Sequence, residues 1–238
     1  MIKLSQRLLG PVTLACLAAT FVLGLWVTPE DQTQKNLVRL LYVHPPIAWV
    51  ALYVSFGTAT ISSCLYLWRR TRSMNLDRIA HCAMEISVVF IVLTLITGSI
   101  WGRPTWGVWW AWDARLTSTT ILGVFALAYL ALRRANDDPV VRARRSAVFA
   151  ILTAINVPII HFSVVWWKTL HQGASVLTST GQLNVHGSML LAMLLGFLGF
   201  TLLFFWLLRE RYRLEVKRDL TSASAVDEAL ALRRREGV

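Results

Sequence analysis

The chain is poor in charged residues, which make up only 16% of its 238 positions, whereas 55% are hydrophobic. A soluble domain normally contains about 25% charged residues. Cysteine is also scarce. The three cysteines show no CxxC spacing, which speaks against a zinc site, and we interpret them as small buried apolar residues. The connections between the apolar runs lack a glycine-rich phosphate loop, so any coupling to ATP requires a partner. The composition therefore predicts a membrane protein without a nucleotide site of its own.

Long apolar runs occur six times, and each is close to the roughly 20 residues that a helix needs to cross a bilayer. We therefore expect an all-α integral membrane protein, with six transmembrane helices over residues 1–208 and a tail at 209–238. The fourth run is the shortest and includes residues 117–120, whose hydroxyls can bond back to helix carbonyls. The six runs are approximately 8–27, 47–68, 80–100, 116–132, 147–167 and 187–208.

Lysine and arginine are unevenly divided between the two ends of the predicted bundle. Of the 24 basic residues, 19 lie at the two termini and in the second and fourth connections, and 5 lie in the other three connections. The positive-inside rule then places both termini in the cytoplasm. The net charge of +11 is explained by these topology signals, so nucleic acid is not an expected partner. The loops that carry His44, a tryptophan-rich stretch and His171 face outward together and can share one site.

The tryptophan-rich stretch runs from Trp101 to Arg115 and holds five of the chain's 11 tryptophans within 12 residues. Gly102, Pro104 and Gly107 discourage a continuous helix, so we expect a loop that presents a flat aromatic platform with cationic edges. Such a platform suits a large planar ligand. The alternative is an interfacial anchor, because tryptophan is enriched where the bilayer meets water. The five tryptophans are Trp101, Trp106, Trp109, Trp110 and Trp112.

Four histidines lie near the outer side of the predicted bundle. His44 precedes two prolines, so its ring either points into the outer cavity or caps the second helix. His171 follows two tryptophans beyond the fifth run, where it is either an axial ligand of a metal macrocycle or a solvated loop residue. His186 begins the sixth run and is the main rival ligand. His161 lies inside the fifth run, where we expect a structural hydrogen bond, with Asn156 as a candidate partner.

The motifs, in their order along the chain, resemble the CcmC family of haem-handling proteins of cytochrome c maturation, which carry the tryptophan-rich "WWD" signature. The resemblance implies a multi-pass protein of the bacterial inner membrane that binds haem b at its periplasmic face, with His44 and His171 as axial ligands. It also implies support of haem transfer to the chaperone CcmE, alongside the ABC transporter subunits CcmA and CcmB and the small membrane protein CcmD. His186 lies past the matched region. The matching segments are 42–45, 101–118, 156–163 and 166–173.

Haem combines an apolar macrocycle, an iron that accepts imidazole nitrogen, and two anionic propionates. The chain offers tryptophan faces for the ring, His44 and His171 for the iron, and Arg103 and Arg115 for the propionates. Two roles are open for Asp113: it orients Arg115, or it caps the fourth helix, which starts one residue later.

Three functions compete for this pattern. The first is a component that binds and transfers haem without independent catalytic turnover. The second is a cytochrome c synthetase of the same WWD group, which we expect to be larger, with additional helices and histidines. The third is a membrane transporter or a transporter subunit for haem, but the sequence shows no inverted repeat or paired broken helices. We therefore predict the first.

Overall fold

The computed structural model describes residues 2–68, 72–171, 185 and 187–235, with side chains described from residue 8 to residue 221 within these ranges. In this part of the chain, six helical segments are long and apolar enough to cross a membrane, and the β-type pairing is confined to one isolated bridge. The predicted all-α fold with six spans is confirmed. Five spans are longer than the apolar runs suggested, because the helices continue into polar residues. The spans are Leu8–Val27, Asn36–Trp68, Met74–Trp106, Ala114–Arg134, Pro139–Trp166 and Gly187–Thr221.

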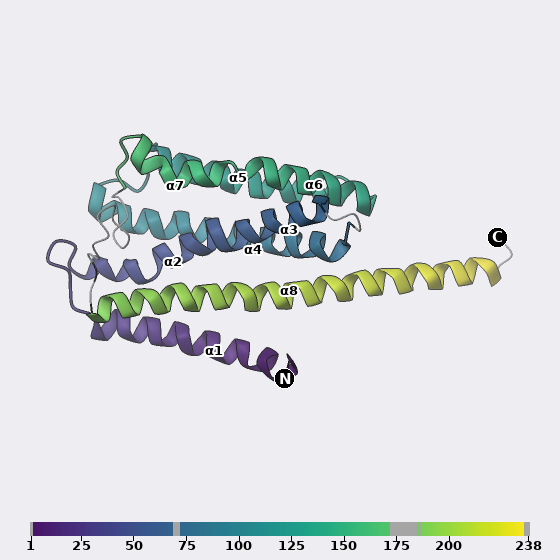
Figure 1. Ribbon diagram of the computed structural model, residues 1–238, viewed down its shortest axis with the longest axis horizontal. Coiled ribbons are helices and arrows are strands. Elements are labelled where there is room, and N and C mark those ends of the chain that lie inside the picture. Colours follow the sequence, from purple (N-terminus) through teal and green to yellow (C-terminus); the bar gives the residue numbers. More distant parts are fainter. Residues whose placement is uncertain (1, 69–71, 172–184, 186, 236–238) are drawn as a thin grey trace.

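The first and last spans lie side by side along one edge of the bundle (Figure 1). Helix α1 (Ile2–Val22) continues as a π-helical turn, η1 (Leu23–Val27), and packs along α8 (Gly187–Arg235). With 49 residues, α8 extends past the ends of the other helices (Figure 1). The expected tail at 209–238 therefore begins within an unbroken helix. Both termini lie at the same end of the bundle (Figure 1).

The second span is a composite of four short helical segments. Pro45 and Pro46 fall in the first turn of α2, where a missing backbone N–H interrupts no helical hydrogen bond. Ser55 ends a π-helical segment and bonds back to the carbonyls of Val50 and Ala51, at 2.8 and 3.1 Å. The segments are η2 (Asn36–Tyr42), α2 (His44–Trp49), η3 (Val50–Ser55) and α3 (Phe56–Trp68).

The third span, α4 (Met74–Trp106), is continuous through the first part of the tryptophan-rich stretch. Our expectation that Gly102 and Pro104 would keep this part out of a helix was wrong. Pro104 lies in the last turn, where its missing N–H removes one backbone hydrogen bond and few helical residues follow it. The helix ends at Gly107, which adopts a left-handed φ of 80° and donates its N–H to the Arg103 carbonyl at 3.0 Å. Only the residues between Gly107 and the next helix form a connection.

The fourth and fifth spans form the layer drawn uppermost in Figure 1 and consist of α5 (Ala114–Arg134), α6 (Pro139–Thr153) and α7 (Asn156–Trp166). Hydroxyls at the start of α5 bond back as predicted: Thr119 Oγ1 donates to the Arg115 carbonyl at 2.7 Å. Helix α7 packs against α5, and α6 packs against α3 and α5.

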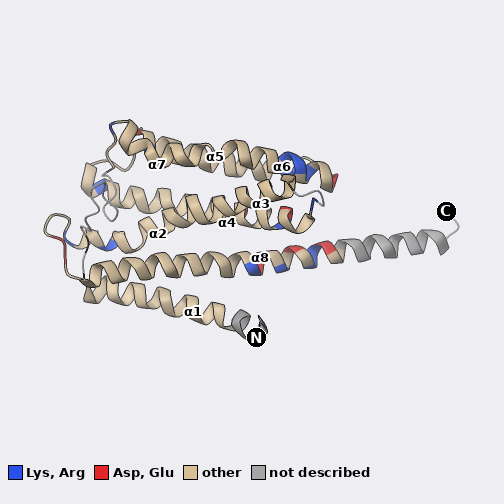
Figure 2. Ribbon diagram, in the orientation of Figure 1, with Lys and Arg blue, Asp and Glu red and all other residues tan. Residues whose placement is uncertain are grey.

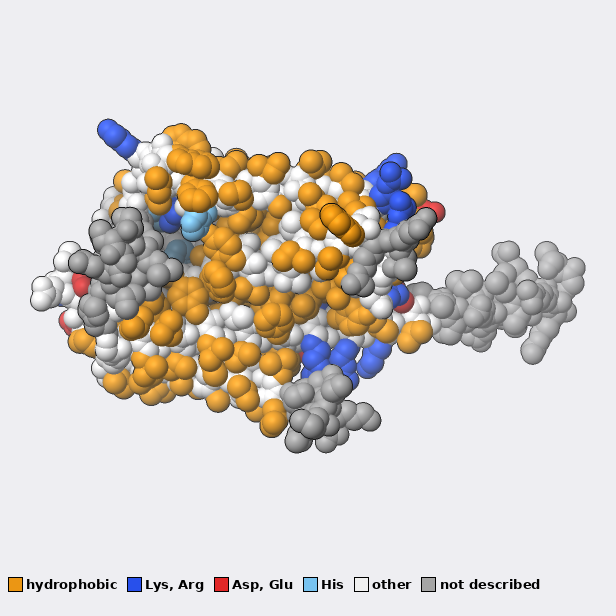
Figure 3. Space-filling view, viewed as in Figure 1, with side chains coloured by type: hydrophobic (Ala, Val, Ile, Leu, Met, Phe, Trp, Pro, Cys, Tyr) orange, Lys and Arg blue, Asp and Glu red, His pale blue; other side chains and the backbone are white. Residues whose placement is uncertain are grey.

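Hydrophobic side chains fill the core, and many large ones are also exposed on the face between the two ends that Figure 3 shows, as expected for helices that face lipid. Lys and Arg gather toward the ends of the bundle (Figure 2). The prediction of buried cysteines holds for Cys82, whereas Cys16 is half-buried and Cys64 is exposed, because α3 turns that side chain outward.

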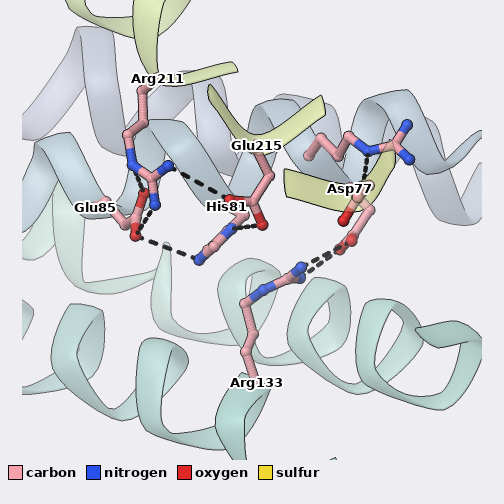
Figure 4. A network of polar contacts seen from close by, with 8 residues as sticks. Asp77, His81, Glu85, Arg133, Arg211 and Glu215 are labelled. Atoms are coloured by element: carbon pink, nitrogen blue, oxygen red, sulfur yellow. Dashed lines mark hydrogen bonds and ion pairs between the residues drawn. The ribbon is translucent and has the colours of Figure 1, made fainter. Parts of the chain in front are cut away.

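Charged side chains join α4, α5 and α8 at the end of the bundle that carries both termini (Figure 4). Asp77 and Arg133 form a doubly hydrogen-bonded ion pair, with N···O distances of 2.5 and 2.9 Å. Arg211 Nε contacts Glu85 Oε2 at 2.8 Å, and His81 Nε2 lies 3.6 Å from Glu85 Oε1. Buried or half-buried charges need such partners, and this network links three helices.

Candidate functional site

A cavity of about 620 Å³ lies among the second to sixth spans, toward the end of the bundle opposite the termini. Its lining is mostly apolar and aromatic, and it includes residues from all three connections that were expected to face one side. Five of the predicted site residues line it, and they come from α2, α4, α5 and the segment after α7: His44, Trp101, Trp106, Arg115 and His171. A volume in this range suits a small-molecule or cofactor ligand.

His44 is the first residue of α2, and its ring reaches across to α4. Its Nδ1 lies 2.9 Å from Thr97 Oγ1, and its ring meets Trp101 edge to face, with centroids 5.8 Å apart. The alternative of a helix-capping side chain was wrong, because the N-cap is Val43 and no side chain caps this helix. Gly98 leaves the space that the ring needs, since a Cβ there would lie 3.1 Å from His44 Cε1.

His171 follows α7 and is held against the start of α5. Its Nδ1 lies 3.0 Å from Asp113 Oδ2, and its ring packs against Trp106 with centroids 4.8 Å apart. Burial lowers the pKa of His171 below its usual value of 6.5, and the hydrogen bond that His171 donates to Asp113 opposes part of that shift. The imidazole is therefore neutral at pH 7, which is the form that coordinates a metal.

The hydrogen bonds of both histidines assign their tautomers. An ionised carboxylate such as Asp113 can only accept, so His171 Nδ1 carries the proton. The Thr97 hydroxyl donates to the Leu93 carbonyl at 2.8 Å, so it accepts from His44 Nδ1. In each ring Nε2 is then the bare nitrogen, available to a ligand in the cavity.

Asp113 performs the predicted capping role and a second role that the sequence did not reveal. Its Oδ1 accepts from the Leu116 N–H at 2.7 Å, which caps α5. Its Oδ2 accepts from His171 and from the Leu170 N–H at 3.2 Å. The proposed alternative of orienting Arg115 has no hydrogen bond to support it among the described residues. The carboxylate therefore ties the segment after α7 to the start of α5.

The other predicted tryptophans lie outside the lining of the cavity. Trp109 and Trp112 are 61% and 82% exposed, and the rings of Trp110 and Trp112 meet at 83°. The expectation of one flat platform was therefore wrong. Helix α4 presents Trp101 and Trp106 to the cavity, whereas Trp109, Trp110 and Trp112 lie in the connection after the helix and outside the lining. Arg103 is also outside the lining, and its Nη1 donates to the Gly107 carbonyl at 2.8 Å.

Arg115 lies at a polar part of the cavity wall, together with Tyr53 of the second span and His161 of the fifth. Its guanidinium makes only long bonds, at 3.4 Å to Ser163 Oγ and 3.3 Å to the His161 carbonyl. Within the described part of the chain, no carboxylate forms an ion pair with it. A half-buried arginine without an anionic partner is well suited to a carboxylate ligand.

His161 has a different hydrogen-bond partner from the one predicted. Its ring bonds the hydroxyl of Tyr53 at 2.6 Å. Asn156, the predicted partner, donates instead to the Ser118 carbonyl, so that prediction was wrong.

Sequence reasoning missed three residues that hold or line the site. Thr97 precedes Trp101 by four residues, or about one helical turn, so the spacing could have predicted that both lie on the same face of α4. Tyr53 was a polar group inside an apolar run. Gln34, which accepts from Trp101 Nε1 at 2.9 Å, lies in a loop and carried no signal. His186, the rival ligand, and the predicted segment 172–173 lie outside the described residues.

Comparison with known proteins identifies the family of the chain. The model of the CcmC family, described as heme exporter protein C, matches residues 1–227. The chain is 40% identical over 208 residues to heme exporter protein C of Haemophilus influenzae, covering 87% of this chain and 83% of that protein. Its identity to the protein of the same name from Bradyrhizobium diazoefficiens is 43%, covering 84% and 77%. For Escherichia coli K12 the values are 36%, 70% and 67%. A match of this extent shows that the chain belongs to the CcmC family, the heme exporter protein C family.

Proposed function

We propose that this protein binds haem b in the cavity at the periplasmic face of the bacterial inner membrane and supports its transfer to the haem chaperone CcmE. The observation that carries the proposal is the pair of imidazoles, His44 and His171, whose Nδ1 atoms are hydrogen-bonded and whose Nε2 atoms are available in one aromatic-walled cavity. Two such nitrogens are the axial donor set of six-coordinate haem.

The remaining walls suit the rest of the haem molecule. Trp101 and Trp106 supply apolar surface for the macrocycle, and Arg115 supplies a cation for a propionate. Membership of a family named for heme export supports haem as the cargo.

Transfer requires partners. We propose that the transporter subunits CcmA and CcmB and the small membrane protein CcmD assemble with this chain, and that ATP hydrolysis, where it is needed, occurs in a partner. The absence of a glycine-rich phosphate loop from the sequence supports that division. The outward tryptophans, Trp109, Trp110 and Trp112, together with Arg103 and Asp113, belong to the same proposed face, where the exposed ones can contact haem or the chaperone.

The proposal is tested by titrating haem into the purified haem-free protein and following the absorption spectrum. We expect a Soret band that saturates at one haem per chain, with the spectrum of bis-histidine iron. A protein that takes up no haem, or takes it up without saturation and without histidine ligation, would contradict the proposed function.

A further inference from the structure

The two histidines of the cavity have hydrogen-bond partners of different charge. At nearly the same distance, 3.0 and 2.9 Å, His171 Nδ1 contacts the carboxylate of Asp113 and His44 Nδ1 contacts the hydroxyl of Thr97. Both rings also meet a tryptophan of α4 edge to face. The aromatic surroundings of the two rings are therefore similar, and their hydrogen-bond partners differ.

The carboxylate of Asp113 is held in place from two directions. Leu116 N–H binds one oxygen, and Leu170 N–H binds the oxygen that contacts His171. Only 7% of the Asp113 side chain is exposed, compared with 19% of His171. A buried, immobilised charge acts strongly on its neighbour, because little water screens it.

A carboxylate and a hydroxyl have different effects on a metal-binding imidazole. A charge-assisted bond at Nδ1 draws the proton away from the ring and raises the basicity of Nε2 toward that of an imidazolate. The Thr97 hydroxyl is neutral, and its own proton is directed at the Leu93 carbonyl. His44 therefore keeps the donor strength of an ordinary imidazole, and His171 becomes the stronger donor.

We infer that Asp113 and Thr97 act as positioning residues that make the two histidines unequal iron ligands, so that His171 retains the iron and His44 is released first when haem leaves. This inference rests on the proposed function. Ligand exchange would then take place on the His44 side of the iron. The bond between the iron and His44 would break as the bond to the incoming ligand forms, and the iron would stay bound through His171. No change of oxidation state is required.

The test uses the full-length protein, loaded with haem and reduced, and the variants His44→Ala and His171→Ala. Each variant leaves one imidazole on the iron, and resonance Raman spectroscopy measures the iron–histidine stretching frequency of five-coordinate ferrous haem. We expect a higher frequency in His44→Ala, where His171 is the ligand, than in His171→Ala. Equal frequencies, or the reverse order, would overturn the inference.

A second set of variants assigns the difference to Asp113. In the His44→Ala background, Asp113→Asn keeps a good helix cap and a neutral acceptor, so we expect the stretching frequency to fall to that of His171→Ala. Asp113→Ser keeps the cap and removes the contact with His171, and we expect haem affinity to fall about 10-fold or more. The matched control is Asp138→Ser, because Asp138 caps α6 through Val140 and Val141. An effect of Asp138→Ser equal to that of Asp113→Ser would reduce the role of Asp113 to capping and overturn its assignment.

Carbon monoxide identifies the released ligand in the protein with both histidines. We expect the Fe–CO vibration of the reduced wild type to match that of His44→Ala, in which CO binds opposite His171. A match to His171→Ala would overturn the inference while the Soret band still supports haem binding. A wild type that binds no haem would instead reject the proposed function itself, so the two failures are distinct.

Discussion

Asp77 of α4 and Arg133 of α5 form two parallel hydrogen bonds inside the bundle, where 4% and 7% of their side chains are exposed. Removing one partner leaves the other charge buried, so we expect Arg133→Leu to destabilise the protein by about 3–5 kcal/mol. Unfolding in detergent micelles measures the change. Arg78→Gln serves as the control, because the pair of Arg78 with Asp219 is partly exposed and such pairs contribute about 0–1 kcal/mol. Equal losses in the two variants would contradict a special role for the buried pair.

Ligation by the two histidines predicts the spectra of their variants. We expect His44→Ala and His171→Ala each to convert six-coordinate haem to a five-coordinate or water-ligated form with a shifted Soret band. Added imidazole should restore the six-coordinate spectrum, since it fills the vacant position without a backbone link. We expect His186→Ala to leave the spectrum unchanged. A changed ligation state in His186→Ala combined with an unchanged one in His171→Ala would show that the ligands were assigned wrongly.

Arg115 provides the test of propionate recognition. Loss of one charge-assisted bond costs about 1.5–3 kcal/mol, so we expect Arg115→Ala to weaken haem binding roughly 10- to 150-fold. Arg115→Lys should recover part of the loss. Arg103→Ala should have a smaller effect, because Arg103 bonds the Gly107 carbonyl and lies outside the cavity lining. Competitive haem transfer to an apo-globin measures the off-rates. Equal rates in wild type and Arg115→Ala would reject the role of Arg115.

The orientation in the membrane is tested with reporter fusions. The charge distribution predicts cytoplasmic termini and outward connections that carry the site. A fusion after Arg134 should report the cytoplasm, and one after Lys168 should report the periplasm. The same signal from both positions would contradict the predicted six-span topology.

The protonation of His171 is open to measurement in the haem-free protein. Burial lowers the pKa of this group, and Asp113 raises it, so we expect protonation below pH 6.5, and at still lower pH in Asp113→Asn. Between the pKa of His171 in the folded protein and its usual value of 6.5, the unfolded chain binds more protons than the folded one. The contribution of this histidine to the free energy of unfolding therefore falls as the pH falls through that window, which is wider in Asp113→Asn. Imidazole nitrogen NMR follows the titration. A midpoint above 6.5 would contradict the burial argument.

The sequence predicted the six spans, the place of His44 at a helix start and the Asp113 cap, because hydropathy, proline position and capping chemistry are local properties. It did not predict the course of α4 through Pro104, because a proline in the last turn removes one backbone hydrogen bond and few helical residues follow it. It also could not pair Asp113 with His171 or Tyr53 with His161. These contacts join residues 58 and 108 positions apart, and only the folded bundle brings them together.

The continuity of α4 has a mechanical consequence. A helix of 33 residues is a rod about 50 Å long. Asp77 near one end is clamped to α5, and near the other end Trp101 and Trp106 are the walls against which the two imidazoles stand. A tilt of α4 about its Asp77 end would move Trp101 and Trp106 together, so the edge-to-face contacts of both imidazoles would change at once.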